Sequence, residues 1–252
     1  MYDKFAQRWK LQRRHECNVL EAIFCDTEYV KEEDIHAIIT DVSSFFSLPL
    51  PEISSKCETF AKVLFSDNAD KCELSYNMEM LQKTGINNRD AFTLCFVHEM
   101  AHQVFFHYRF MLFYSERWVQ ELAADLMAGL YAERHSLATG KYKYALSIQK
   151  PSITHPNGNL RKEIVECGRH YLERMSVDGE SMVEMAVKYM PFFVFTHYDT
   201  LENDWRKMTD ELELPPPPPP KPINIDELPD SNLLKQAVMK YRKQEKNDHV
   251  HN

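Results

Sequence analysis

The pentapeptide HEMAH at residues 98–102 constrains the fold of this chain more than any other feature. Residues four apart in an α-helix lie about 40° apart around its axis, so both imidazoles would face the same side. The apolar run at residues 92–97 leads into the motif, and the pattern predicts a helix from Asp90 to about Tyr114, capped by Asn88 or Asp90. On such a helix two histidines can bind one divalent ion. The alternative is a pair of helix histidines without a metal.

A catalytic zinc needs a third protein ligand beside two histidines. Glu121 is the natural candidate, because it lies 19 residues after His102 on a second predicted helix, residues 117–137. Asp125 lies four residues later on the same face, where it could accept a hydrogen bond from a ligand histidine and fix its tautomer. Neutral imidazoles favour zinc, so we predict one Zn²⁺ per chain. The alternative for this acidic pair is a solvent-exposed helix face.

Composition and periodicity predict a mostly helical α+β fold. Apolar residues make up 44% of the 252 residues and only 6 residues are glycine, which favours helices over an all-β fold. Two short strand-like runs, 59–65 and 71–77, flank a turn composition and predict a small hairpin or sheet edge. Most of the remaining sequence has helical periodicity, which predicts helices at 17–47, 160–176 and 180–209. Residues 138–159 are predicted to form a loop region.

The composition changes where six consecutive prolines begin at Pro215. Such a run forms a stiff polyproline II spacer. We therefore predict one folded domain at 1–213, with its motifs within 72–170, a linker at 214–222 and a tail at 223–252 with a possible short helix. The tail is either disordered or a helix that docks on a partner or on the cleft of its own chain.

Charge and cysteine content exclude several other classes. The net charge of −8 argues against a general nucleic-acid binder, and the mildly basic residues 1–16 favour a solvated first helix over a nucleic-acid arm. No run of 18 apolar residues occurs, so no membrane span is expected. The six cysteines form no CxxC pair and no export signal precedes them, which predicts reduced thiols and a cytoplasmic location.

The order of the motifs resembles that of a known enzyme family. HEMAH is followed by Glu121 and Asp125 on a second helix, and then by a His155-Pro step with Arg161 six residues after that histidine. This order resembles the gluzincin-type HExxH zinc metallopeptidases. Among them it is similar to soluble relatives of the HtpX and CAAX-prenyl endopeptidase family and to Lit-like phage-exclusion peptidases. The resemblance spans about residues 72–170, and the transmembrane helices of the membrane peptidases have no counterpart here.

The resemblance implies a zincin-like domain, in which a small mixed sheet lies over the HExxH helix and the lower half is helical. It implies His98, His102 and Glu121 as the ligands of one zinc ion. Glu99 would be the general base, and Asp125 would support a ligand histidine.

By the same resemblance, His155 and Arg161 would lie near the substrate carbonyl and stabilise the oxyanion. The alternative is an ordinary loop followed by the start of a helix. The predicted reaction is hydrolysis of peptide bonds in an intracellular protein or peptide substrate, with the substrate lying along a sheet edge near residues 71–77. The alternative is a non-catalytic, zinc-containing helical protein with a binding or regulatory role, although such a site would have no need of Glu99.

Overall fold

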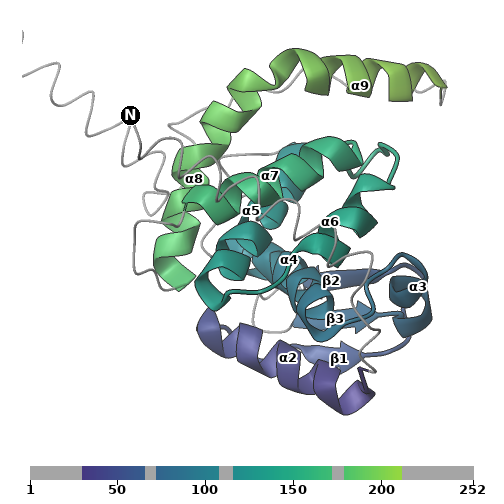
Figure 1. Cartoon of the computed structure of the whole chain (residues 1–252), viewed down its shortest axis with the longest axis vertical. Helices are drawn as coiled ribbons and strands as arrows, with labels where there is room; N and C mark the ends of the chain where they lie inside the picture. The colour runs from purple at the N-terminus through teal and green to yellow at the C-terminus, as the bar shows by residue number, and fades with distance from the viewer. Residues whose placement is uncertain (1–29, 66–71, 108–115, 172–178, 212–252) are drawn as a thin grey trace, which may run out of the picture. The chain divides into compact units, whose positions relative to one another are not determined.

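The computed structural model describes residues 30–65, 72–107, 116–171 and 179–211. They form a mostly helical structure with one small mixed sheet (Figure 1), which confirms the predicted α+β class. The elements, in chain order, are α2 (Glu32–Phe45), β1 (Glu52–Ser54), β2 (Ala61–Phe65), β3 (Cys72–Tyr76), α3 (Met78–Lys83), α4 (Arg89–His107), α5 (Arg117–His135), α6 (Gly140–Ser147), α7 (Gly158–Tyr171), α8 (Gly179–Thr196) and α9 (Tyr198–Glu211).

The sheet has the strand order β1–β3–β2, so β3 is its central strand. β2 and β3 form the predicted antiparallel pair, with Val63 opposite Leu74. β1, which the sequence did not predict, pairs with β3 in parallel, with Ile53 opposite Leu74. The prediction of an open edge near residues 71–77 is therefore wrong, because both sides of β3 are already hydrogen-bonded to a neighbouring strand. Within the described part of the chain, β1 and β2 form the two edges.

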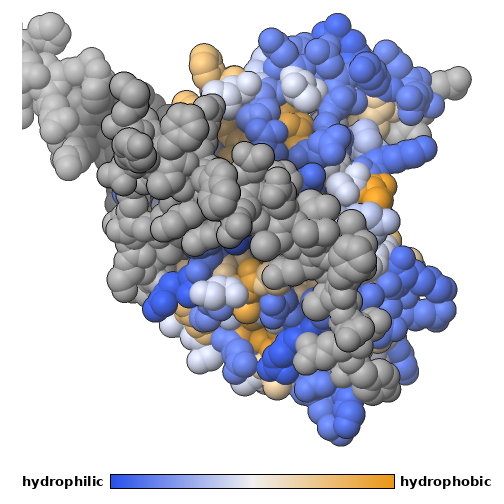
Figure 2. All heavy atoms as spheres, viewed as in Figure 1, coloured by the Kyte–Doolittle hydropathy of each residue, from blue (hydrophilic) through white to orange (hydrophobic). Residues whose placement is uncertain are grey.

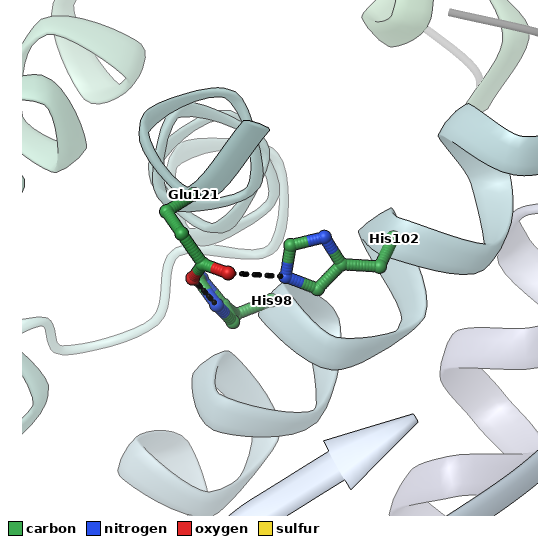
Figure 3. Close-up of side chains that lie close together, drawn as sticks. All are labelled: His98, His102 and Glu121. Carbon is green, nitrogen blue, oxygen red and sulfur yellow. Dashed lines mark hydrogen bonds and ion pairs between the residues drawn. The ribbon is translucent and has the colours of Figure 1, made fainter. Parts of the chain in front are cut away.

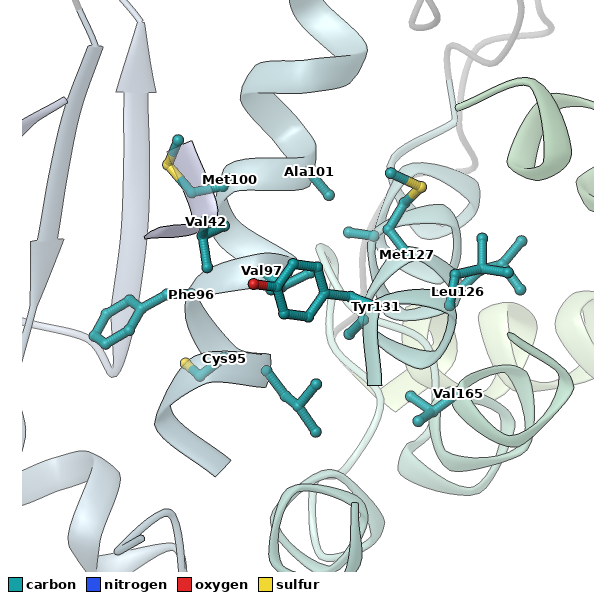
Figure 4. Close-up of a cluster of buried hydrophobic side chains, with 14 of the residues drawn as sticks. Val42, Cys95, Phe96, Val97, Met100, Ala101, Leu126, Met127, Tyr131 and Val165 are labelled. Carbon is teal, nitrogen blue, oxygen red and sulfur yellow. The ribbon is translucent and has the colours of Figure 1, made fainter. Parts of the chain in front are cut away.

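Helix α4 lies between the sheet and the helical half of the structure (Figure 4). On one side Phe96 points towards the strands and meets Tyr76 of β3 edge to face, with ring centroids 5.7 Å apart. On the other side Val97 faces α5, where Met127 and Tyr131 belong to the same buried cluster. Because close packing holds α4 from both sides, its polar side chains are presented on a rigid element.

Helices α5 and α7 approach each other at two glycines. A Cβ atom added to Gly129 would lie 2.1 Å from the carbonyl oxygen of Val165, and one added to Gly168 would lie 2.6 Å from that of Leu126. Both distances are far below ordinary van der Waals contact, so only glycine permits this approach. Since α5 and α7 both carry predicted site residues, the contact sets how far apart those residues lie.

The helices after α5 differ from the prediction in two places. Residues 138–159, predicted as a loop, contain α6, which packs on α7 and buries Tyr142. The glycines and prolines that suggested a loop lie at the start of α6 or beyond its end. Residues 180–209, predicted as one helix, form α8 and α9 with a break at His197. The His197 ring lies against α7 at this break, with Nε2 3.1 Å from Glu163 Oε1.

Several predictions fall on residues outside the described ranges: the basic segment 1–16, the linker 214–222 and the tail 223–252. Helix α9, the last described element, buries Met208, and the surface over it is largely hydrophilic (Figure 2). Among the described helices, none combines the length and the apolar character that crossing a membrane requires.

Candidate metal centre

Helix α4 presents the two histidines of the HEMAH motif. The helix begins after Asn88, whose side-chain oxygen accepts a hydrogen bond of 2.9 Å from the backbone N–H of Ala91. His98 and His102 lie one turn apart, with ring centroids separated by 5.0 Å. His98 is buried whereas His102 is half-buried, so the pair lies where the protein interior meets the surface.

Glu121 of α5 completes a group of three side chains that could hold a metal ion. Its carboxylate points between the two imidazoles (Figure 3), with Oε2 3.1 Å from His98 Nε2 and Oε1 3.5 Å from His102 Nε2. The three ligand atoms lie within 4.8 Å of one another. Two nitrogens and one carboxylate oxygen from two packed helices therefore converge on one point, as the sequence predicts.

The electrostatics of the three groups are tightly linked. Burial alone would raise the pKa of Glu121, but its bonds with His102, His155 and His98 hold that pKa well below the usual value. Burial alone would lower the pKa of His98, but Asp125 and then Glu121 raise it to about 10. A protonated imidazole cannot bind a metal, so a metal ion and this proton exclude each other.

Asp125 lies behind His98 and is completely buried. His98 Nδ1 donates a hydrogen bond of 2.9 Å to its Oδ1, which leaves His98 Nε2 facing Glu121. This is the contact with a ligand histidine that the sequence predicts for Asp125. Burial would raise the pKa of Asp125, but Arg161 and then His98 lower it, so the carboxylate is ionised.

Arg161 occupies a different place from the one predicted. Its guanidinium donates to Asp125 Oδ2 at 2.7 Å and Oδ1 at 3.1 Å and to Gln149 Oε1 at 2.5 Å, and the side chain is buried. Because its donors are engaged inside the protein, the oxyanion role predicted for Arg161 does not fit this geometry. Tyr142 of α6, which sequence analysis missed, donates a further 3.0 Å hydrogen bond to Asp125 Oδ1. No motif spacing singles Tyr142 out, and its segment was predicted as a loop.

His155, in the loop between α6 and α7, reaches the same group. Its Nε2 lies 3.1 Å from Glu121 Oε2, and its Nδ1 lies 2.7 Å from the Thr154 hydroxyl. The side chain is 38% exposed, so it borders the centre without being enclosed by it. The structure therefore brings His155 to the candidate ligands, while its catalytic role stays a prediction.

Glu99 follows His98 on α4 and is half-buried. Cys95, one turn earlier, is buried, and burial followed by the charge of Glu99 raises the pKa of its thiol. A thiol with a raised pKa is a poor nucleophile. Cys95 is therefore not a candidate nucleophile, and the candidate reactive groups described in this region are histidines and carboxylates.

Comparison of the chain with protein-family models, with curated proteins and with solved structures finds no match. The motifs and the geometry of the centre itself are therefore what point to a function.

Proposed function

We propose that this protein is a zinc-dependent endopeptidase of the gluzincin type. The observation that carries the proposal is the convergence of His98, His102 and Glu121 within 4.8 Å, with Glu99 next to the first histidine on the same helix. Three ligands of these types fit a catalytic zinc site, which leaves one coordination position open. A structural zinc site would normally use four protein ligands and would have no need of Glu99.

The arrangement of the elements supports a zincin-like fold. The small sheet lies against one side of α4, and α5, α6 and α7 form a helical half on the other side. This is the layout that the resemblance to gluzincins implies. The third ligand, on the helix after the motif, and Asp125, four residues later, also agree with that family.

The chemistry follows from the residue types. When bound, zinc polarises the carbonyl of the scissile bond and lowers the pKa of a water molecule. Glu99 accepts a proton from the attacking water and passes it to the leaving amine. Because the carboxylate has to act at the open side of the centre, its half-buried position beside His98 suits this role.

His155 is the proposed donor to the substrate oxyanion. If its Nδ1 accepts the hydrogen bond of the Thr154 hydroxyl, the ring proton lies on Nε2, which faces Glu121 and is near the centre. Such a donor stabilises negative charge that develops on a carbonyl oxygen. It takes over the role that Arg161 cannot fill.

The substrate would bind as an extended chain beside β2. This strand contacts α4 and has one side unpaired within the described residues, and its Lys62 and Leu64 side chains are exposed. An extended peptide can add to such an edge through backbone hydrogen bonds. The proposed peptide-binding edge is therefore β2 and not the central strand β3.

The proposal is tested by metal content and peptide cleavage measured on the same proteins. We expect one equivalent of zinc by mass spectrometry in the wild type, and its loss in His98→Ala and Glu121→Ala. The exposed residues His36 and Glu116 give matched controls, and His36→Ala and Glu116→Ala should keep the zinc. The wild type should cleave members of a peptide library.

Glu99→Gln separates binding from catalysis. It should keep zinc and lose about 100-fold or more of the cleavage rate, since a general base contributes about that much. A wild type that holds no zinc even after zinc loading would refute the proposal. Zinc binding without cleavage of any peptide would instead support the non-catalytic binding or regulatory protein.

A further inference from the structure

The carboxylate of Asp125 connects three helices at the back of the metal centre. Its Oδ1 accepts hydrogen bonds from His98 of α4, Tyr142 of α6 and Arg161 of α7, at 2.9, 3.0 and 3.1 Å. Its Oδ2 accepts the 2.7 Å bond from Arg161 Nε. Since Asp125 is completely buried, these protein donors and not water determine how the carboxylate is oriented.

The orientation of the carboxylate determines the orientation of His98. Because Oδ1 holds the Nδ1 side of the ring, Nε2 is directed at Glu121 Oε2, 3.1 Å away. Arg161 contacts both carboxylate oxygens and so defines the carboxylate plane. Tyr142 adds its donor to the same oxygen that holds His98, which restrains that oxygen from a second direction.

The Tyr142 hydroxyl has no apolar packing role, because phenylalanine would fill the same space. The residue is 2% exposed, and its hydroxyl donates to Asp125. Helix α6, which carries it, is anchored by two buried lysines: Lys141 Nζ donates to Asn87 Oδ1 and Lys143 Nζ to Glu166 Oε2, each at 2.6 Å. The Tyr142 hydroxyl therefore contacts Asp125 from a helix whose position is fixed by two buried lysine hydrogen bonds.

We propose that Tyr142 is a positioning residue of the metal centre, whose hydroxyl acts through Asp125 to hold His98 in its metal-binding orientation. This inference rests on the proposed function, because it assumes that His98 is a metal ligand. Direct hydrogen-bond partners of a metal-binding histidine change metal affinity by about 10- to 100-fold when they are removed. Tyr142 acts one hydrogen bond further out, through Asp125, so we expect an effect at the lower end of that range.

The test compares Tyr142→Phe with Tyr144→Phe in the full chain. Tyr144 lies on the same helix and is 56% exposed, so its variant loses a hydroxyl at the surface only. The zinc dissociation constant is measured by competition with a chromophoric chelator, and the absorption spectrum is recorded with cobalt bound. The melting temperature of each metal-free protein shows whether the fold is intact. Tyr142→Phe should bind zinc about 10-fold more weakly and show an altered cobalt spectrum.

The outcomes separate this inference from the proposed function. Tyr144→Phe should behave as the wild type in both measurements. If Tyr142→Phe keeps the wild-type zinc affinity, or loses affinity while its cobalt spectrum per bound ion stays unchanged, the positioning role is overturned and the proposed function stands. If the wild type binds neither metal, both fall. If the wild type binds metal but cleaves no peptide, only the peptidase function falls.

Discussion

Replacing Gly129 with alanine tests how the α5–α7 contact supports the centre. The added Cβ would meet the carbonyl oxygen of Val165 at 2.1 Å. To restore an ordinary contact of 3.4 Å, the two helices would have to separate by about 1.3 Å, because the clash is with backbone and no side chain can rotate away. Glu121 and Asp125 lie on α5, so the same separation would pull them from their partners on α7 and in the loop before it.

Two opposing effects decide the sign of the change in stability. Alanine is favoured over glycine inside a helix by about 1 kcal/mol. Inserting a methyl group into a closely packed contact costs about 1–3 kcal/mol, and here the clash is at the severe end. We therefore expect Gly129→Ala to lower the free energy of unfolding by about 1–2 kcal/mol. Zinc affinity should fall as well.

Urea unfolding followed by circular dichroism measures this change. Gly168→Ala, which clashes with the carbonyl oxygen of Leu126 at 2.6 Å, forces apart the same two helices. The double variant should therefore lose less stability than the two single losses added together, because one separation relieves both clashes. A Gly129→Ala protein that is about 1 kcal/mol more stable than the wild type, as helix propensity alone requires, would refute the reasoning.

Three further outcomes are expected. Ser136 ends α5 at φ 56°, so Ser136→Gly should raise the free energy of unfolding in urea by about 0.5–1 kcal/mol. Burial alone would raise the pKa of Glu166, but the hydrogen bond and charge of Lys143 bring that pKa below its unfolded value of 4.5. The stability that Glu166 contributes is therefore fully present above pH 4.5 and is lost as the pH falls through the lower folded pKa. In urea titrations at decreasing pH, Glu166→Gln should lose less stability than the wild type. Trp205→Ala removes the edge-to-face contact with Trp118, 5.1 Å between centroids, so α9 should be cut faster in limited proteolysis.

The candidate ligands could be predicted from the sequence because their geometry is local. The four-residue spacing of His98 and His102 fixes their common face once the segment is helical, and the strong apolar pattern around them makes it so. To predict Glu121 as a ligand, one must also assume that a second helix packs on the first. The four-residue spacing of Glu121 and Asp125, which puts both carboxylates on one face of that helix, supported this assumption. The β2–β3 hairpin was also local, since a short turn composition joins the two strands.

The features that the sequence did not reveal depend on distant contacts. β3 is a central strand because it pairs in parallel with β1, about 20 residues earlier, and nothing in the local pattern of either strand encodes that pairing. The periodicity of α7 places Arg161 on a helix but does not say which partner it meets. Helix α6 was not predicted because glycines and prolines, which break helices, lie at its start and beyond its end. Tyr142, which lies on this helix, was missed for the same reason.

The buried polar network around Asp125 is difficult to explain by stability alone. Burying the ion pair with Arg161 carries a desolvation penalty, and well-packed apolar residues of similar volume often stabilise a protein as well as such a pair does. Tyr142 adds another buried polar group where phenylalanine would fit. If these groups only stabilised the fold, apolar residues could replace all of them at once with no loss of function. The variant that tests this carries Asp125→Leu, Arg161→Met and Tyr142→Phe. Because the same network directs His98 towards Glu121, we expect that triple variant to remain folded by circular dichroism and to lose zinc binding, which ties these buried groups to the metal centre.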